Sequence, residues 1–233
     1  MKKLILISLI ILAMINVYGQ GIESGSLWQA EMVYDTLDNK LPREKIQRFM
    51  YFENENEIST LTIYEKMSMT NGEVIISYLV EANNLEKKSD TEYKVKEFRV
   101  DNFKLINNDS IFYKEKYFSL GFKRIDVKQS SITESQLMDF LFSSSVRKYY
   151  DNGESLNQIH TYKRNGNKAI QIVDSHSNWE SDFRVFSFEG FLFLKGITSA
   201  PMIIEKLEDE KLIGKEVDYR FNVKNFEIRK EKL

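Results

Sequence analysis

Residues 183–195 read FRVFSFEGFLFLK and contain two strand-like runs, Phe183–Phe188 and Phe191–Lys195, separated by Glu189-Gly190. Gly190 has no Cβ and readily adopts the positive φ that a two-residue hairpin turn requires. Aromatic and apolar residues on both sides of such a turn are typical of paired antiparallel strands. This stretch therefore predicts a β-hairpin.

Short strands and turns continue along most of the chain. Around Tyr93 and Val95, for example, apolar residues alternate with Lys94 and Lys96, which places the two kinds of side chain on opposite faces of a strand. Further strand-like runs cover residues 27–36, 48–52, 58–65, 74–80, 91–100, 110–113, 117–125, 156–162, 169–173, 202–207, 212–219 and 221–228. Consecutive hairpins without alternating helices predict an all-β protein, a predominantly antiparallel meander that curls into a barrel or half-barrel.

One segment departs from this alternation. Two overlapping motifs within residues 131–136 fit a capping box, and Leu137, Phe140 and Leu141 follow at helical spacing. They predict one short helix near 133–147, whose end within Ser143–Val146 the sequence leaves open. This helix stands between two β-rich segments, about 26–128 and 150–229, which leaves open whether the strands form one barrel or two lobes joined by the helix. Glycine and proline are too sparse there for a flexible linker, which favours a single domain over 20–233.

The first twenty residues predict export. Lys2 and Lys3 precede a mostly apolar run over 4–17, and small or compact residues, Val17 and Gly19, stand where a signal peptidase requires them. The run is shorter than the roughly 20 residues of a membrane span. We therefore expect a signal peptide over 1–19, a periplasmic or extracellular location, and no membrane span in the mature chain.

Composition excludes several classes of protein and site. The chain has no cysteine, so it forms no disulfide, carries no thiol nucleophile or cysteine-ligated cluster, and is not a lipoprotein. Its 33 basic and 35 acidic residues give a net charge of −2, which provides no general attraction for phosphate backbones, and we expect no nucleic-acid partner. No phosphate-binding loop or other cofactor motif occurs, and we expect no cofactor.

Catalytic candidates are few, because the chain has only two histidines. The alternation around His160 predicts a strand histidine on a polar face or hydrogen-bonded in the sheet. Asp174 and His176 lie in a segment rich in oxygen and nitrogen ligands and are candidate ligands of a divalent metal, although the same residue types build ordinary turns. A hydrolase of envelope or extracellular polymers, using carboxylates or this metal, is therefore the alternative function and the weaker one.

Binding has better support, because aromatic residues concentrate around the predicted hairpin. Side chains from both strands would give the hairpin an aromatic face that either packs in the core or lines an apolar cavity. The candidate ligand-binding residues are Trp179, Phe183, Phe186, Phe188, Phe191 and Phe193. We expect an exported non-catalytic protein that binds a small apolar molecule or an envelope protein. A structural interaction protein that pairs through its sheet edges is a further alternative.

Overall fold

The computed structural model describes residues 22–32, 45–67, 74–89, 91–95, 102–114, 119–151, 155–165, 168–174, 179–197, 199–218 and 222–231. The expected signal peptide lies outside these residues and stays a prediction. Within the described ranges, no helix combines the length and apolar character needed to cross a membrane.

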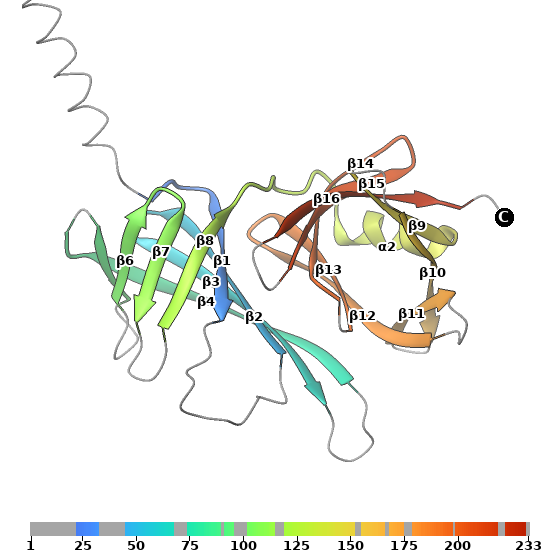
Figure 1. Cartoon of the computed structure of the whole chain (residues 1–233), viewed down its shortest axis with the longest axis horizontal. Coiled ribbons are helices and arrows are strands. Elements are labelled where there is room, and N and C mark those ends of the chain that lie inside the picture. Colours follow the sequence, from blue (N-terminus) through green and yellow to red (C-terminus); the bar gives the residue numbers. More distant parts are fainter. Residues whose placement is uncertain are drawn as a thin grey trace, which may run out of the picture. The chain divides into compact units, whose positions relative to one another are not determined.

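The strands form two closed eight-stranded barrels (Figure 1). The first contains β1 (Ser26–Met32), β2 (Lys45–Asn54), β3 (Glu57–Met67), β4 (Val74–Lys87), β5 (Glu92–Val95), β6 (Asn102–Asn107), β7 (Ser110–Lys114) and β8 (Ser119–Ile125). The second contains β9 (Val146–Tyr150), β10 (Ser155–Asn165), β11 (Lys168–Asp174), β12 (Trp179–Phe188), β13 (Phe191–Gly196), β14 (Met202–Glu208), β15 (Lys211–Val217) and β16 (Val223–Lys230). The predicted all-β antiparallel fold is confirmed.

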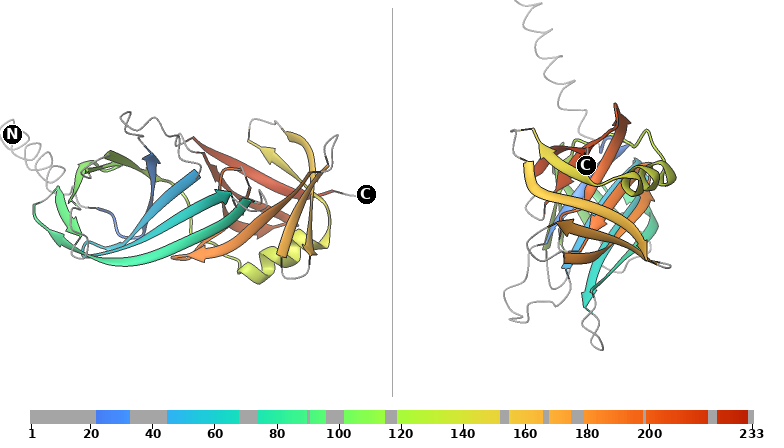
Figure 2. Two further views of the ribbon diagram at one scale, coloured as in Figure 1. Left: turned by 90° about the horizontal axis from the view of Figure 1, so that it is seen from below. Right: turned by 90° about the vertical axis from the view of Figure 1, so that its right-hand side faces the viewer.

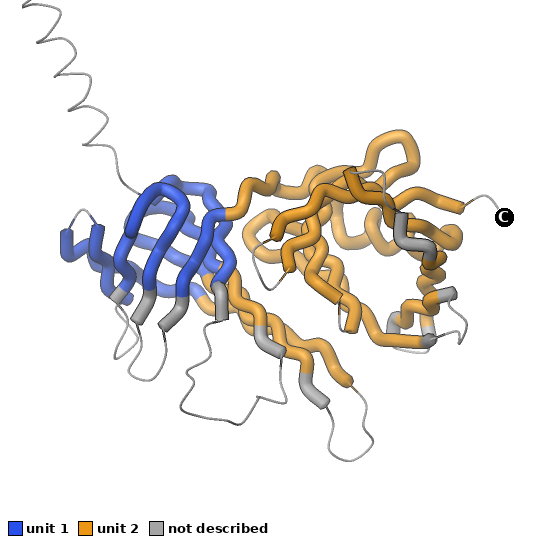
Figure 3. Tube along the Cα trace, in the orientation of Figure 1, with its two compact units in different colours: residues 1–35, 50–59, 82–124 blue, residues 36–49, 60–81, 125–233 orange. Residues whose placement is uncertain are grey.

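The contacts of the chain divide it into two compact units (Figure 3). Unit 1 consists of residues 1–35, 50–59 and 82–124, and unit 2 consists of residues 36–49, 60–81 and 125–233. Unit 2 therefore contains the second barrel together with parts of β2, β3 and β4.

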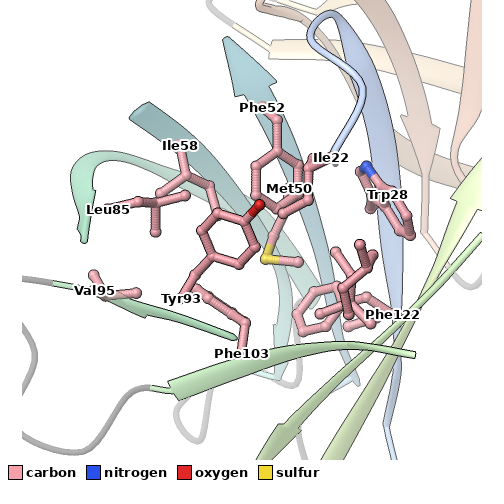
Figure 4. Close-up of a cluster of buried hydrophobic side chains, with 13 residues drawn as sticks. Ile22, Trp28, Met50, Phe52, Ile58, Leu85, Tyr93, Val95, Phe103 and Phe122 are labelled. Carbon is pink, nitrogen blue, oxygen red and sulfur yellow. The ribbon is translucent and has the colours of Figure 1, made fainter. Parts of the chain in front are cut away.

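Apolar side chains fill the inside of the first barrel (Figure 4). Trp28 lies edge-on to Phe52, with ring centroids 6.0 Å apart, and its indole Nε1 donates a hydrogen bond of 2.8 Å to Ser26 Oγ. The buried residues of this cluster are Ile22, Trp28, Ala30, Met50, Phe52, Ile58, Leu85, Tyr93, Val95, Phe103, Leu105, Ile111 and Phe122. Because they alternate along their strands, they form a continuous core inside unit 1.

Helix α2 (Glu134–Ser143) begins at the predicted capping box. The Thr133 backbone N–H donates to Gln136 Oε1 over 2.8 Å, and the Gln136 N–H donates to Thr133 Oγ1 over 3.3 Å. Its buried face packs into the second barrel, where the helix contacts β10 and β12 (Figure 2). The cluster there consists of Leu137, Phe140, Leu141, Val146, Tyr162, Phe183, Leu192, Leu194, Met202, Ile204, Leu212, Phe226 and Ile228.

Among the described residues, the predicted single short helix is confirmed, and it is shorter than the range near 133–147. The helix ends at Ser143, and Val146 and Arg147 already belong to β9. Val146 is buried inside the barrel and pairs with His160 on one side and Lys230 on the other. This pairing closes the second barrel. The local sequence contains no helix-breaking residue at that point, so the long-range pairing of β9 with β10 and β16 determines that the segment is a strand.

The hairpin at residues 183–195 has the predicted two-residue turn. Phe188 pairs with Phe191, and both turn residues have positive φ, 48° at Glu189 and 78° at Gly190. Such a turn matches the right-handed twist of the strands on either side of it.

Gly214 of β15 lies close to the backbone of the neighbouring strand β14, so its substitution tests the packing of the second barrel. A Cβ added there would overlap the Ile203 carbonyl oxygen and lie 3.1 Å from Ile204 Cα, whereas Gly121, also in a strand, has open space at the same position. We expect Gly214→Ala to lower the free energy of unfolding by about 1–3 kcal/mol, because the backbone of β14 must shift. Urea denaturation measures this loss. An equal effect of Gly121→Ala would contradict the steric explanation.

Candidate functional site: the polar end of the second barrel

The structure divides the predicted ligand-binding aromatics between two faces of the β12–β13 hairpin. Phe183 faces the inside of the second barrel, where it lies edge-on to Tyr162 with ring centroids 4.8 Å apart. The remaining phenylalanines alternate onto the outer face, and all of them are buried: Phe186, Phe188, Phe191 and Phe193. Trp179 is the first residue of β12 and pairs with Val173. The predicted set therefore does not converge on one site.

The outer face of the hairpin packs against parts of β2 and β4 that belong to unit 2. Phe186 and Phe193 stack with ring centroids 5.4 Å apart. Phe193 lies edge-on to Phe49 of β2 at 5.2 Å, and Phe186 stacks on Tyr78 of β4 at 4.2 Å. The aromatic face is thus packed core within unit 2.

A buried ion pair lies on the same outer face. Lys195 and Glu65 expose only 1% and 5% of their side chains and form a salt bridge. The Lys195 ammonium also donates to the carbonyl oxygens of Gly196, at 2.8 Å, and Ser199, at 2.6 Å. These acceptors satisfy the N–H bonds of the ammonium group, which is the arrangement expected of a structural buried lysine.

Polar side chains gather inside the second barrel at the end away from α2. Along β16 the inward-facing residues run from Lys224 through Phe226 to Ile228, and along β9 from Tyr150 through Lys148 to Val146. On these strands the apolar residues Val146 and Ile228 lie nearer α2 than the polar residues Tyr150 and Lys224. Lys230, the next residue on this face of β16, lies against the helix, with its ammonium 5.2 Å from the centroid of the Phe140 ring. We call the six inward-facing residues Lys148, Tyr150, His160, Gln171, Glu216 and Lys224 the polar end of the barrel.

His160 has a partner on only one of its two ring nitrogens. The Gln171 amide Nε2 contacts His160 Nδ1, and because an amide N–H₂ group only donates, Nδ1 accepts and the neutral ring carries its proton on Nε2. Nε2 is buried and has no hydrogen-bond partner in the part of the chain that the structure describes. Burial, reinforced by the nearby Lys148 ammonium, lowers the pKa of His160 to about 4. The ring is therefore neutral at pH 7 and presents an unused N–H donor.

Lys148, Glu216 and Tyr150 form a hydrogen-bonded group next to this histidine. Glu216 Oε2 accepts from the Lys148 ammonium and, over 3.0 Å, from the Tyr150 hydroxyl. The Lys148 ammonium also lies 5.1 Å from the centroid of the Tyr150 ring. Burial raises the pKa of Tyr150, and the hydrogen bond and charge of Lys148 partly oppose this rise. The Tyr150 hydroxyl therefore stays protonated and donates.

The metal hypothesis stays a prediction. Asp174 is the last residue of β11 and pairs with Ile159, while His176 lies outside the described residues. Among the described residues, no group of three or more histidine, aspartate or glutamate side chains is placed to hold a metal ion.

The polar end could not be predicted from the sequence. Lys148 directly follows the range of the predicted helix, and Gln171, Glu216 and Lys224 lie in predicted strands. In the sequence, the residues of the polar end are marked only by a polar residue that stands two positions from an apolar residue on the same face of a strand, as His160 does from Tyr162. This pattern can be recognised as a site only when the pairing of all eight strands is known, because the pairing shows which residues face the inside of the barrel. Comparison with protein-family models, curated proteins and solved structures yields no match to this chain.

The buried histidine predicts a pH-dependent stability. The pKa of His160 is about 4 in the folded chain and about 6.5 in the unfolded chain, so between these values the unfolded chain binds more protons. The contribution of neutral His160 is fully present above pH 6.5 and is lost as the pH falls towards 4. It amounts to at most about 3 kcal/mol, at about 1.36 kcal/mol per pKa unit.

His160→Gln isolates this contribution from the titration of carboxylates. We expect the free energy of unfolding of the unmodified chain, relative to the variant, to fall by up to about 3 kcal/mol between pH 7 and pH 4. Urea denaturation of both proteins at a series of pH values measures the difference. A difference that does not change with pH would contradict the assignment of a depressed pKa to His160.

Proposed function

We propose that the chain is an exported, non-catalytic protein whose second barrel binds a small, mostly apolar molecule at its polar end. The unused Nε2–H donor of His160 carries this proposal. A buried donor without a partner costs about 1–3 kcal/mol, and a ligand carbonyl, hydroxyl or carboxylate oxygen would recover this cost. Apolar residues inside the same barrel, including Phe183 and Phe226, would contact the body of the ligand.

Among its described residues, the inner face of the first barrel carries no buried polar side-chain atom that lacks a partner. The unpartnered side-chain amide of Gln47 lies on β2, on the opposite face from the inward-facing Met50 and Phe52. The inner cluster of this barrel is apolar, and the polar atom of Trp28 already has a partner in Ser26. A site that fixes the orientation of an apolar ligand requires a few convergent polar groups. The second barrel supplies them within one group of neighbouring strands.

Binding of the uncharged dye Nile red tests the proposal. We expect saturable binding with a blue-shifted emission, and His160→Leu to weaken it about two- to tenfold, because one hydrogen bond contributes about 0.5–1.5 kcal/mol. Lys163→Leu is the control, since Lys163 is exposed on the other face of the same strand. Absence of binding to the unmodified protein would overturn the proposal, as would equal binding by both variants.

Export is tested separately by the intact mass of the protein purified from its own host. We expect the chain to begin at Gln20, which corresponds to cleavage after Gly19. Native mass spectrometry of the same sample would show any co-purifying small molecule. A mature chain that retains Lys2 and Lys3 would contradict export through a cleaved signal peptide.

A further inference from the structure

We propose that the molecule bound in the second barrel carries an anionic group, such as a carboxylate, which Lys224 and Lys148 hold beside the His160 donor. This inference rests on the proposed function and specifies the chemical class of the ligand. It follows from the distribution of charge on the inner faces of β9, β15 and β16.

The only carboxylate of the polar end is already satisfied. Glu216 accepts from the Lys148 ammonium and from the Tyr150 hydroxyl through the same oxygen, Oε2. The side chains of Lys148 and Glu216 expose 13% and 17% of their surface, so this pair is largely shielded from water. Its two charges compensate each other, and the pair as a whole contributes no net charge.

Lys224 adds an uncompensated positive charge to this pair. It pairs in register with Glu216, and its ammonium lies 5.5 Å from the centroid of the Tyr150 ring, on which Lys148 also rests. Among the described residues, Lys224 forms no ion pair. The Tyr150 ring therefore lies against two ammonium groups, and only one of them has a carboxylate partner.

These groups are chemically matched to an amphipathic anion. Lys224 supplies a charged donor for an anionic group, and the His160 N–H supplies a neutral donor inside the same barrel. A cationic ligand would meet two lysines, and a neutral ligand would use only the histidine. Lys224 is exposed, so its attraction is screened by salt and is strongest at low ionic strength.

Three ligands with the same ten-carbon chain separate these cases: decanoate, 1-decanol and decylammonium. Calorimetric titration at pH 7.5 and low salt should give decanoate an affinity about tenfold higher than that of decanol, with decylammonium the weakest. One charge-assisted hydrogen bond in place of a neutral contact accounts for a difference of this size.

Two variants should move the affinity for decanoate in opposite directions. Lys224→Gln should weaken decanoate about five- to tenfold and leave decanol within about twofold, whereas Glu216→Gln should strengthen decanoate by removing the competing negative charge. Lys211→Gln is the control, because Lys211 lies on the outer face of β15 beside Glu227, at 4.0 Å, and should change neither affinity.

The outcomes distinguish the two proposals. If decanol binds as tightly as decanoate, or if Lys224→Gln weakens both equally, the anionic ligand is overturned while the binding function stands. If Nile red binds but none of the three probes does, the anionic ligand is likewise overturned. If the unmodified protein does not bind Nile red, the proposed function itself fails.

Discussion

We expect Lys195→Met to lower the free energy of unfolding by about 3–5 kcal/mol. The substitution leaves the Glu65 carboxylate buried without its lysine and removes the donor that the Gly196 and Ser199 carbonyl oxygens share. Methionine has a similar length and is apolar, so loss of packing contributes little. Chemical denaturation followed by circular dichroism measures the loss.

The double variant Glu65→Leu with Lys195→Met separates the cost of removing the lysine from beside the buried Glu65 carboxylate from the value of the ion pair. Two apolar residues leave no buried charge, so we expect the double variant to be clearly more stable than Lys195→Met alone. The exposed pair of Lys206 and Glu208 supplies the control, and Lys206→Met should change stability by less than about 1 kcal/mol. A loss below 1 kcal/mol for Lys195→Met would show that the pair is not buried as described.

We expect Phe193→Ala to lower the free energy of unfolding by about 3–5 kcal/mol, because it removes a fully buried ring and leaves a cavity. The lost contacts include the stacked ring of Phe186 and the edge-on ring of Phe49. Phe193 faces away from the inside of the barrel, so the folded variant should bind Nile red with unchanged affinity.

Phe112→Ala is the matched control for the removal of a phenyl ring. Phe112 is 41% exposed on β7, and its truncation should cost about 1 kcal/mol or less. If Phe193→Ala retained full stability but lost ligand binding, the aromatic outer face and not the polar end would be the binding site.

Features that depend on neighbouring residues could be predicted from the sequence. The turn at Glu189 and Gly190 needs only positive φ between two apolar strands, and the start of α2 needs only the reciprocal bonds of Thr133 and Gln136. Both predictions are confirmed, because short-range chemistry determines them.

Features that depend on distant partners could not be predicted. β9 has no apolar alternation to identify it, since Lys148 faces inward and the outward Arg147 and Tyr149 are half-buried. Its partner strand β16 is far along the chain. Similarly, alternation placed Phe186 and Phe193 on one face of the hairpin but contained no information on which face lies inside the barrel, because both faces are apolar and buried.

The pairing of β9 with β16 has a consequence for the order in which the chain is synthesised. Arg147, on the first strand of the second barrel, forms an ion pair with Glu231, 84 positions later. At about 5–20 residues per second, a ribosome needs roughly 4–17 s to add that length of chain. During this time one edge of β9 has no neighbouring strand, and an unpaired edge readily pairs with other chains. Protection of that edge during translation therefore determines how much of the nascent chain reaches the closed barrel.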